Sequence, residues 1–140
     1  MSYEVKVDPA VSDDLQELAA PQPSIDAAWR LHDDEIVPAI DLAIRLIQSL
    51  RADPYQGDLM EGRANAMILR GCRRLKFDPR EPWPRTREGH PNARMRLVWI
   101  NEPHEGAIAL VRILAVAHRF DARPYAAAAT RLGALRRKRT

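Results

Sequence analysis

Alternating apolar and polar positions predict one strand at the start of the chain and three more in its second half. Residues 3–8 read YEVKVD, so every second side chain is apolar, as on a half-buried strand. Residues 71–77 alternate in the same way. Two longer apolar runs follow at 95–100 and 108–117, and residues 101–106 between them hold the proline and the glycine of a hairpin connection.

The part of the chain between the first strand and the second is predicted to be mainly helical. Residues 15–19 have the apolar spacing of a short helix. A longer amphipathic helix is expected over residues 24–50, with Ser24 as its N-cap and a kink at Pro38. It dominates an extended helical region over residues 24–60.

Two further helices are predicted. The first is a short one over residues 59–69. The second is rich in alanine, starts near Asp121 or Arg123 and ends near Leu135. The basic tail 136–140 is expected to be disordered and to add nonspecific affinity for nucleic acid.

The predicted order of elements is strand, helices, three antiparallel strands and helix, which indicates an α+β domain. We expect a small antiparallel sheet that includes the N-terminal strand and packs against the helical region. A chain of 140 residues with 46% hydrophobic side chains fits one domain, here residues 1–135. Trp29 and Trp99 fall at apolar periodic positions, so both are expected in the core.

The composition excludes several classes of protein. A single cysteine, Cys72, rules out an internal disulfide framework, and we expect a small buried thiol in a reducing compartment. No cysteine and histidine array has zinc spacing, and no phosphate-binding or dinucleotide-binding loop occurs, so no metal or cofactor is expected. The N-terminus does not resemble a secretion signal, and no apolar run is long enough to span a membrane, which favours the cytoplasm.

Charge is divided unequally along the chain. Residues 1–62 hold 13 acidic and four basic side chains, a balance of −9, whereas residues 63–140 hold six acidic and 18 basic ones, a balance of +12; together they give +3. The C-terminal half could therefore meet a polyanion. Two solvated faces that neutralise each other explain the division equally well.

Three side chains that could bind a phosphate lie at the ends of the last two strands and at the start of the last helix. Arg96 opens one strand, Arg119 ends the next, and Tyr125 lies in the first turn of the last helix. Arginine holds phosphate oxygens through two donors at once and keeps its charge. Such groups suit RNA cleavage by the neighbouring 2′-hydroxyl, because that reaction needs proton transfer and stabilisation of a charged phosphorane rather than a metal.

The C-terminal third of the chain resembles the RelE/ParE superfamily of toxins from bacterial type II toxin–antitoxin systems. In that superfamily a strand of the form Arg-Leu-Val-aromatic precedes a strand that ends in a triplet such as Gly-His-Arg, and a tyrosine follows six residues later. This chain carries Arg96-Leu97-Val98-Trp99, then Ala117-His118-Arg119, then Tyr125. The segments YEVKVDPAVSDDL and GCRRLKFDP also resemble the opening and the second strand of the family.

The resemblance implies a RelE-like fold and an endoribonuclease that inhibits translation by cutting messenger RNA on the ribosome. It places Arg96 and Arg119 at the scissile phosphate, and Tyr125 would orient a base or join the proton transfer. It also implies a cognate antitoxin, expected to be acidic, that blocks the basic residues. A homodimer and a toxin–antitoxin hetero-oligomer are both compatible with it.

The chain departs from the family at the expected general base. RelE enzymes carry lysines just before the strand that starts at Arg96, and this chain has none there. Because arginine is a poor base at neutral pH, His90 or His118 would have to remove the hydroxyl proton. The helical region 24–60 also exceeds the family's usual helical hairpin, and it could form an antitoxin groove, a homodimer face or a cover for the core.

An arginine-rich loop before Arg96 supplies candidate RNA contacts. Arg85, Arg87 and Arg94 are expected to bind the RNA backbone, although solvation of the loop explains them nearly as well. Trp83 lies between two prolines and either stacks a base or covers the edge of the sheet.

Two other functions remain open at the level of sequence. The missing lysines favour a ParE-like toxin that binds and inhibits DNA gyrase without cutting RNA, whereas Arg119 and Tyr125 favour the ribonuclease. The third alternative is a relative without toxicity that only binds a partner.

Overall fold

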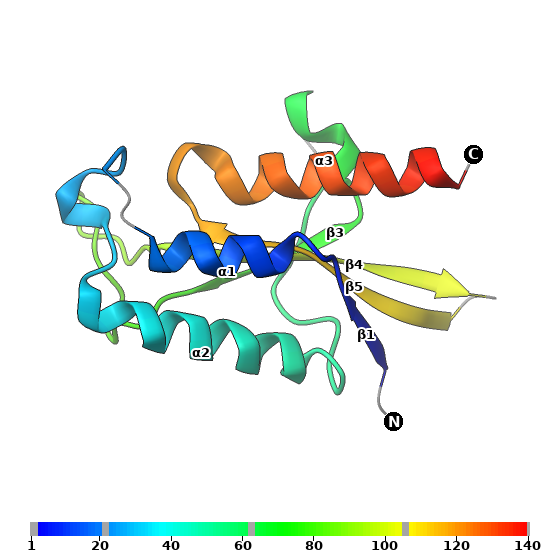
Figure 1. Cartoon of the computed structure of the whole chain (residues 1–140), viewed down its shortest axis with the longest axis horizontal. Helices are drawn as coiled ribbons and strands as arrows, with labels where there is room; N and C mark the ends of the chain where they lie inside the picture. The colour runs from blue at the N-terminus through cyan, green and yellow to red at the C-terminus, as the bar shows by residue number, and fades with distance from the viewer. Residues whose placement is uncertain (1–2, 21–22, 62–63, 105–106, 140) are drawn as a thin grey trace.

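A five-stranded sheet forms the centre of the described part of the chain, with the strands in the order β1-β5-β4-β3-β2 (Figure 1). The structure is a computed structural model, and it describes residues 3–20, 23–61, 64–104 and 107–139. β1 joins the sheet as predicted but is parallel to β5, so the expectation of a purely antiparallel sheet is wrong at this strand; the other neighbours are antiparallel. The strands are β1 (Glu4–Val7), β2 (Asp58–Leu59), β3 (Cys72–Phe77), β4 (Met95–His104) and β5 (Ala107–His118).

Within the described residues, three α-helices lie around this sheet, so the predicted α+β class is confirmed. In Figure 1 the sheet is seen nearly edge-on, with α3 on one side and α2 on the other. None of the described helices is long and apolar enough to cross a membrane. The helices are α1 (Val11–Ala19), α2 (Asp33–Ser49) and α3 (Arg123–Lys138), and short 3-10 helices are η1 (Ala27–Trp29), η2 (Ala64–Leu69) and η3 (Phe120–Ala122).

The four predicted strands are confirmed, but the connection predicted over residues 101–106 is wrong. The paired strands β4 and β5 continue to His104 and Ala107, and the two residues between them lie outside the described part of the chain. The two-residue strand β2 was not predicted, because a strand this short has no periodicity to detect.

The continuous helix predicted from Ser24 is also wrong. Asp26 accepts a hydrogen bond from the Ala28 amide and caps η1 instead. α2 begins only at Asp33, and the amide of the preceding His32 donates to the Glu35 carboxylate in the first turn. The residues before Asp33 therefore form a connection that contains η1, rather than the first turns of α2.

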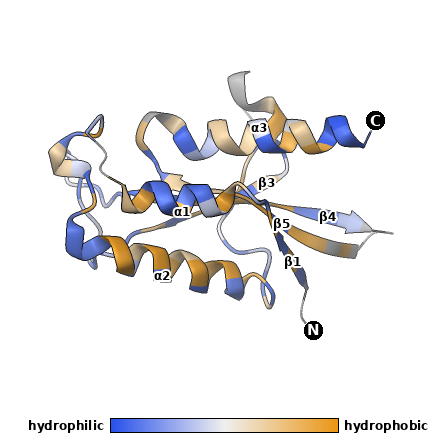
Figure 2. Cartoon of the chain, viewed as in Figure 1, coloured by the Kyte–Doolittle hydropathy of each residue, from blue (hydrophilic) through white to orange (hydrophobic). Residues whose placement is uncertain are grey.

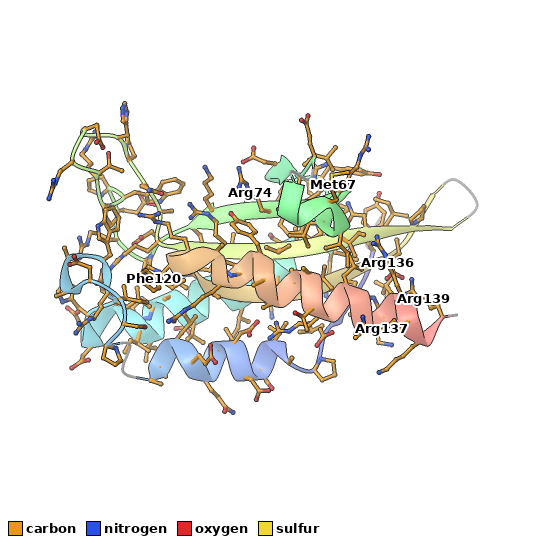
Figure 3. The ribbon with its side chains drawn as sticks, turned by 90° about the horizontal axis from the view of Figure 1, so that it is seen from above. Met67, Arg74, Phe120, Arg136, Arg137 and Arg139 are labelled. Atoms are coloured by element: carbon orange, nitrogen blue, oxygen red, sulfur yellow. The ribbon has the colours of Figure 1, made fainter. Side chains whose placement is uncertain are left out.

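The predicted disorder of the basic tail is contradicted as well. α3 continues through Lys138, and only residue 140 of the tail lies outside the described part. Basic side chains near the last turn favour this helix, because they interact with its negative C-terminal dipole. Figure 3 shows α3 starting beside Phe120 and ending near Arg136, Arg137 and Arg139, at the other end of the molecule.

A separate hydrophobic core lies on each face of the sheet. On one face, the apolar side chains of α1 and α2 pack against Met95, Leu97 and Trp99. On the other, α3 packs against Cys72 and Val98. Figure 2 shows α2 as largely hydrophobic and the C-terminal end of α3 as hydrophilic. The predicted burial of Trp99 and Cys72 is confirmed, and burial raises the pKa of the Cys72 thiol to about 11.

An ion pair closes the edge of β5 where β1 ends. β1 pairs with β5 only as far as Ile113, and beyond it the Asp14 carboxylate of α1 accepts from the Val116 amide at 3.0 Å. Arg131 of α3 donates to both oxygens of Asp14, at 2.6 and 2.7 Å, and to the Leu114 carbonyl at 2.8 Å. Asp14 therefore satisfies the sheet edge and joins two helices.

A second ion pair network, centred on the fully buried Arg94, joins α2 to the sheet. Its guanidinium binds Asp78 through Nε at 2.9 Å and Nη2 at 2.8 Å, and Glu35 through Nη1 at 3.1 Å and Nη2 at 2.7 Å. Nη1 also donates to the Arg30 carbonyl at 2.9 Å, so all five N–H donors are used. The network fixes the start of α2 against the end of β3 and the start of β4.

This network should make the free energy of unfolding depend on pH in the acidic range. The hydrogen bond from Arg94 outweighs burial and lowers the pKa of Glu35 from 4.5 to about 2. Between these values the unfolded chain binds a proton that the folded chain does not, so the free energy of unfolding should fall as pH drops from 4.5 toward 2. Denaturant unfolding over this range should show a shallower pH dependence for Glu35→Gln than for the wild type. The exposed Asp41→Asn is the matched control, and identical slopes for Glu35→Gln and wild type would contradict the assignment.

Removing the edge carboxylate should destabilise the fold strongly. Asp14→Ala leaves the Arg131 guanidinium and the Val116 amide without their partner, which should lower the free energy of unfolding by roughly 3 kcal/mol. Its exposed neighbour offers the control, since Asp13→Ala should cost less than about 1 kcal/mol. Equal losses for the two variants in urea unfolding would show that Asp14 has no special role at the edge.

Candidate functional site

Cationic side chains from three strands meet at one end of the sheet, beside the start of α3. The strand register pairs Lys76 with Arg96 and Arg74 with Val98, so these side chains share the face that α3 covers. α3 packs on the apolar part of this face. Its first turn carries Tyr125 to the edge of the cationic part, and Figure 3 shows Arg74 on β3.

Arg74 and Tyr125 contact each other directly. Nη1 of Arg74 donates to the phenol oxygen of Tyr125 at 3.1 Å, and its guanidinium carbon lies 5.9 Å from the centre of the ring. Nε of Arg74 is buried and has no hydrogen-bond partner among the described residues, because the carboxylate of Asp58 is 3.9 Å away. Arg74 therefore orients the phenol and keeps an unused donor.

Arg96 interacts with both members of this pair. It is 6% exposed, and Nη1 donates to the carbonyls of Ala93 and Met95, at 2.6 and 2.9 Å. Burial lowers the pKa of Arg96, and the positive charges of Arg119 and Arg74 add to that effect, while Tyr125 opposes it. Cations are thus gathered closely enough to destabilise one another, as at a site that binds an anion.

Arg119 completes the cluster from the end of β5. Its amide donates to the Arg94 carbonyl at 2.8 Å, and its guanidinium carbon lies 4.8 Å from the centre of the Trp29 ring. Nε of Arg119 is buried, and no described residue accepts a hydrogen bond from it. The predicted core position of Trp29 is wrong: the side chain is half-buried on η1 and faces this arginine.

These groups could together hold a phosphate. We use the name cation cluster for Arg74, Lys76, Arg96, Arg119 and Tyr125. Unpartnered guanidinium donors bind phosphate oxygens through charge-assisted hydrogen bonds, and a low-dielectric setting strengthens them. The exposed Lys76 and the phenol add groups that can carry a proton.

His118 is not available as a general base, contrary to the prediction. It is 2% exposed, and Nδ1 accepts from the Phe120 amide at 3.0 Å. Nε2 therefore carries the proton and donates to the Trp29 carbonyl at 2.8 Å. Burial lowers the pKa of His118, which favours this neutral form. Both ring nitrogens serve the structure.

Arg94 is also not an RNA contact, because its side chain is fully buried and paired with two carboxylates. The other loop candidates lie on the surface. Arg85 donates to the Gly89 carbonyl, and the exposed His90 is tied to Thr86 through its backbone. Among the described residues, no hydrogen bond joins His90 or the exposed Arg87 to the cation cluster, and Trp83 is half-buried.

Arg74 and Lys76 were missed at the level of sequence. The family resemblance pointed to lysines only in the loop directly before Arg96, where this chain has none, whereas the sheet brings Lys76 to Arg96 from the neighbouring strand. The signal was present in the alternation of residues 71–77, which puts Arg74 and Lys76 on one face. Only the register between β3 and β4 shows that this is also the face of Arg96.

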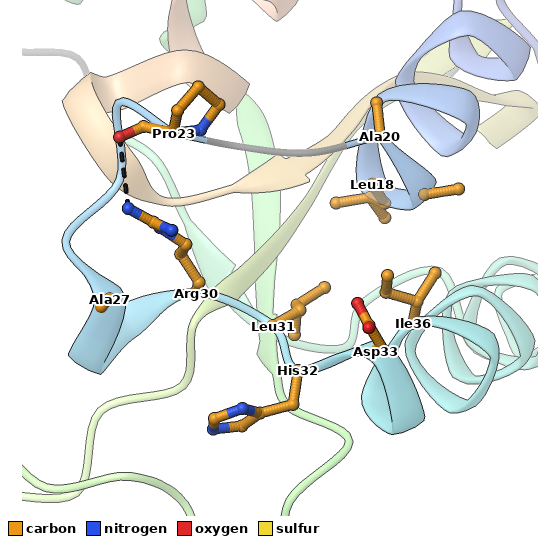
Figure 4. A pocket seen from close by; sticks show the side chains of 10 residues that line it. Leu18, Ala20, Pro23, Ala27, Arg30, Leu31, His32, Asp33 and Ile36 are labelled. Atoms are coloured by element: carbon orange, nitrogen blue, oxygen red, sulfur yellow. Dashed lines mark hydrogen bonds between the residues drawn. The ribbon is translucent and has the colours of Figure 1, made fainter.

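No metal site accompanies the cluster within the described residues, since no group of three or more histidine, cysteine, aspartate or glutamate side chains there could hold an ion. A pocket of about 500 Å³ lies elsewhere, between the end of α1 and the start of α2 (Figure 4). Leu18, Leu31 and Ile36 form its apolar wall, and Arg30 reaches across to the Pro23 carbonyl. The described residues that line it include none from the cation cluster.

Comparison with known proteins found similarity to a solved structure but none at the level of sequence. No family model matches the chain, and no curated protein matches it in sequence. A solved structure of a double mutant of the E. coli toxin RelE in the free state is similar, with a TM-score of 0.49 and 13% sequence identity. The match covers 94% of this chain and 98% of that one.

Proposed function

We propose that this chain is the toxin of a type II toxin–antitoxin pair and acts as a metal-independent endoribonuclease. The observation that carries the proposal is the grouping of Arg74 and Arg96 with Tyr125, with Arg119 close enough to Arg96 to lower its pKa. The Nε atoms of Arg74 and Arg119 are buried and have no hydrogen-bond partner among the described residues. The sequence resemblance to RelE enzymes supports the same activity. Messenger RNA on the ribosome is the proposed substrate.

The cluster suits attack of a ribose 2′-hydroxyl on the neighbouring phosphorus. Arg119 and Arg74 would donate to the non-bridging oxygens through their guanidinium groups, and the buried Arg96 would add positive charge nearby. These contacts strengthen as the phosphorane gains charge, which is the condition for catalysis rather than mere binding.

Two groups of the cluster remain for the proton transfers. Tyr125, oriented by Arg74, would take part in removing the proton of the 2′-hydroxyl. The ammonium of Lys76 would protonate the leaving 5′-oxygen. An acidic cognate antitoxin would silence the protein by pairing with these cations.

Removing Arg119 should reduce cleavage sharply. Arg119→Ala loses a donor to the phosphorane, so primer extension on ribosome-bound mRNA should show cleavage slowed by at least roughly 10²-fold. Arg45→Ala, on the exposed surface of α2, should cleave like the wild type. Unchanged products and growth arrest in Arg119→Ala would remove this residue from the mechanism, and breaks confined to DNA would end the ribonuclease proposal.

Proton donation by Lys76 can be tested separately from its positive charge. Lys76→Arg keeps a cation opposite Arg96 but cannot give up a proton at neutral pH, so cleavage should still fall by roughly 10²-fold. Lys6→Arg, at the exposed edge strand β1, controls for the substitution itself. Full activity in Lys76→Arg would leave only an electrostatic role for this position.

A further inference from the structure

The segment between α1 and α2 is fastened to the elements that carry the cation cluster. We call residues 23–32 the strap. His118, at the end of β5, donates to the Trp29 carbonyl at 2.8 Å, and Arg94, just before β4, donates to the Arg30 carbonyl at 2.9 Å. Arg123, at the start of α3, donates to the Ser24 hydroxyl at 2.8 Å. These hydrogen bonds hold the strap beside the site.

The strap presents an aromatic ring to Arg119. The guanidinium carbon of Arg119 lies 4.8 Å from the centre of the Trp29 ring. Among the described residues, the Arg119 guanidinium makes no hydrogen bond or ion pair, and its Nε is buried. Its orientation therefore depends on the ring.

An aromatic partner suits an arginine that must bind a phosphate. A carboxylate would neutralise the guanidinium and compete with the phosphate for its N–H groups. The face of an indole ring attracts the cation through its π electrons, without accepting a hydrogen bond in the guanidinium plane. Trp29 can thus fix Arg119 and leave its donors free.

We infer that Trp29 is a positioning residue, which holds the Arg119 guanidinium in the orientation that receives the scissile phosphate. His118 and Arg94 hold Trp29 in turn, through the carbonyls of Trp29 and Arg30. This gives the two buried side chains, Arg94 and His118, a role beside the site. The catalytic consequence rests on the proposed ribonuclease function, whereas the orientation of Arg119 does not.

The catalytic consequence is tested by replacing Trp29 with an aliphatic side chain and, separately, with a smaller aromatic one. Trp29→Leu should reduce kcat for RNA cleavage about tenfold with little change in KM, and Trp29→Phe, which keeps a π face, should restore most of the loss. In an Arg119→Ala background, Trp29→Leu should have no further effect, because the residue acts through Arg119. A full additional loss in that background, or wild-type cleavage by Trp29→Leu, would overturn the inference.

The orientation itself is tested without activity. In the NMR spectrum of the full chain, the Nε–H proton of Arg119, identified by its absence in Arg119→Lys, should be shifted by the ring current of Trp29. The shift should disappear in Trp29→Leu and persist in Trp29→Phe, with thermal unfolding used to check that both variants fold. An Nε–H signal that is the same in wild type and Trp29→Leu would overturn the inference, whether or not the protein cleaves RNA. A shifted signal in a protein that does not cleave RNA would reject the proposed function alone.

Discussion

The buried guanidinium of Arg94, held by the carboxylates of Glu35 and Asp78, is the interaction on which both the fold and the candidate site depend. Its side chain joins α2 to the sheet, and its carbonyl accepts from the Arg119 amide at 2.8 Å. A buried charge is tolerated only when fully paired, and here every N–H donor is used. The same residue also fixes the strap through the Arg30 carbonyl. A substitution in this network would therefore alter the site even if every residue of the cation cluster were kept.

The site differs from this network in one physical respect. Arg94 is held by two carboxylates through hydrogen bonds, whereas Arg74 and Arg119 both act on Arg96, and the nearby carboxylate of Asp58 is 3.9 Å from Nε of Arg74. Within the described part of the chain, Nε of Arg74 and Nε of Arg119 make no hydrogen bond. Stability would favour pairing all of them. The complete pairing of Arg94 marks it as a structural cation, whereas the less completely paired Arg74, Arg96 and Arg119 are the ones that the proposed function assigns to the phosphate.

Much of the fold could be predicted from the sequence, because alternation along β1, β3, β4 and β5 is a local property. The same pattern, together with the family resemblance, suggested Arg96, Arg119 and Tyr125 as site candidates, since strand ends and helix starts are local too. The predictions failed where distant segments decide the outcome. Arg94 and His118 look like loop and strand-end residues that are free to act, and only packing shows that carboxylates and carbonyls occupy them.

Strand register and the interrupted helix account for the differences at Lys76 and Trp29. Lys76 lies 20 positions before Arg96 and reaches it only through the pairing of β3 with β4, which no local pattern specifies. Trp29 was predicted in the core because its periodicity continued that of α2, yet the strap interrupts the helix and turns the ring toward Arg119. Trp29, Arg94 and His118, which were misplaced from sequence, thus all lie beside the site.

If the cation cluster promotes attack by the 2′-hydroxyl of RNA, the loss of that one hydroxyl must stop the reaction. The most direct measurement compares a ribosome-bound message with the same message carrying one 2′-deoxy nucleotide at the cleavage position. We predict that the single substitution abolishes cleavage there, and that the unmodified message gives a 5′-hydroxyl on the downstream fragment. Cleavage that persists at the 2′-deoxy position, or a downstream fragment with a 5′-phosphate, would contradict this mechanism.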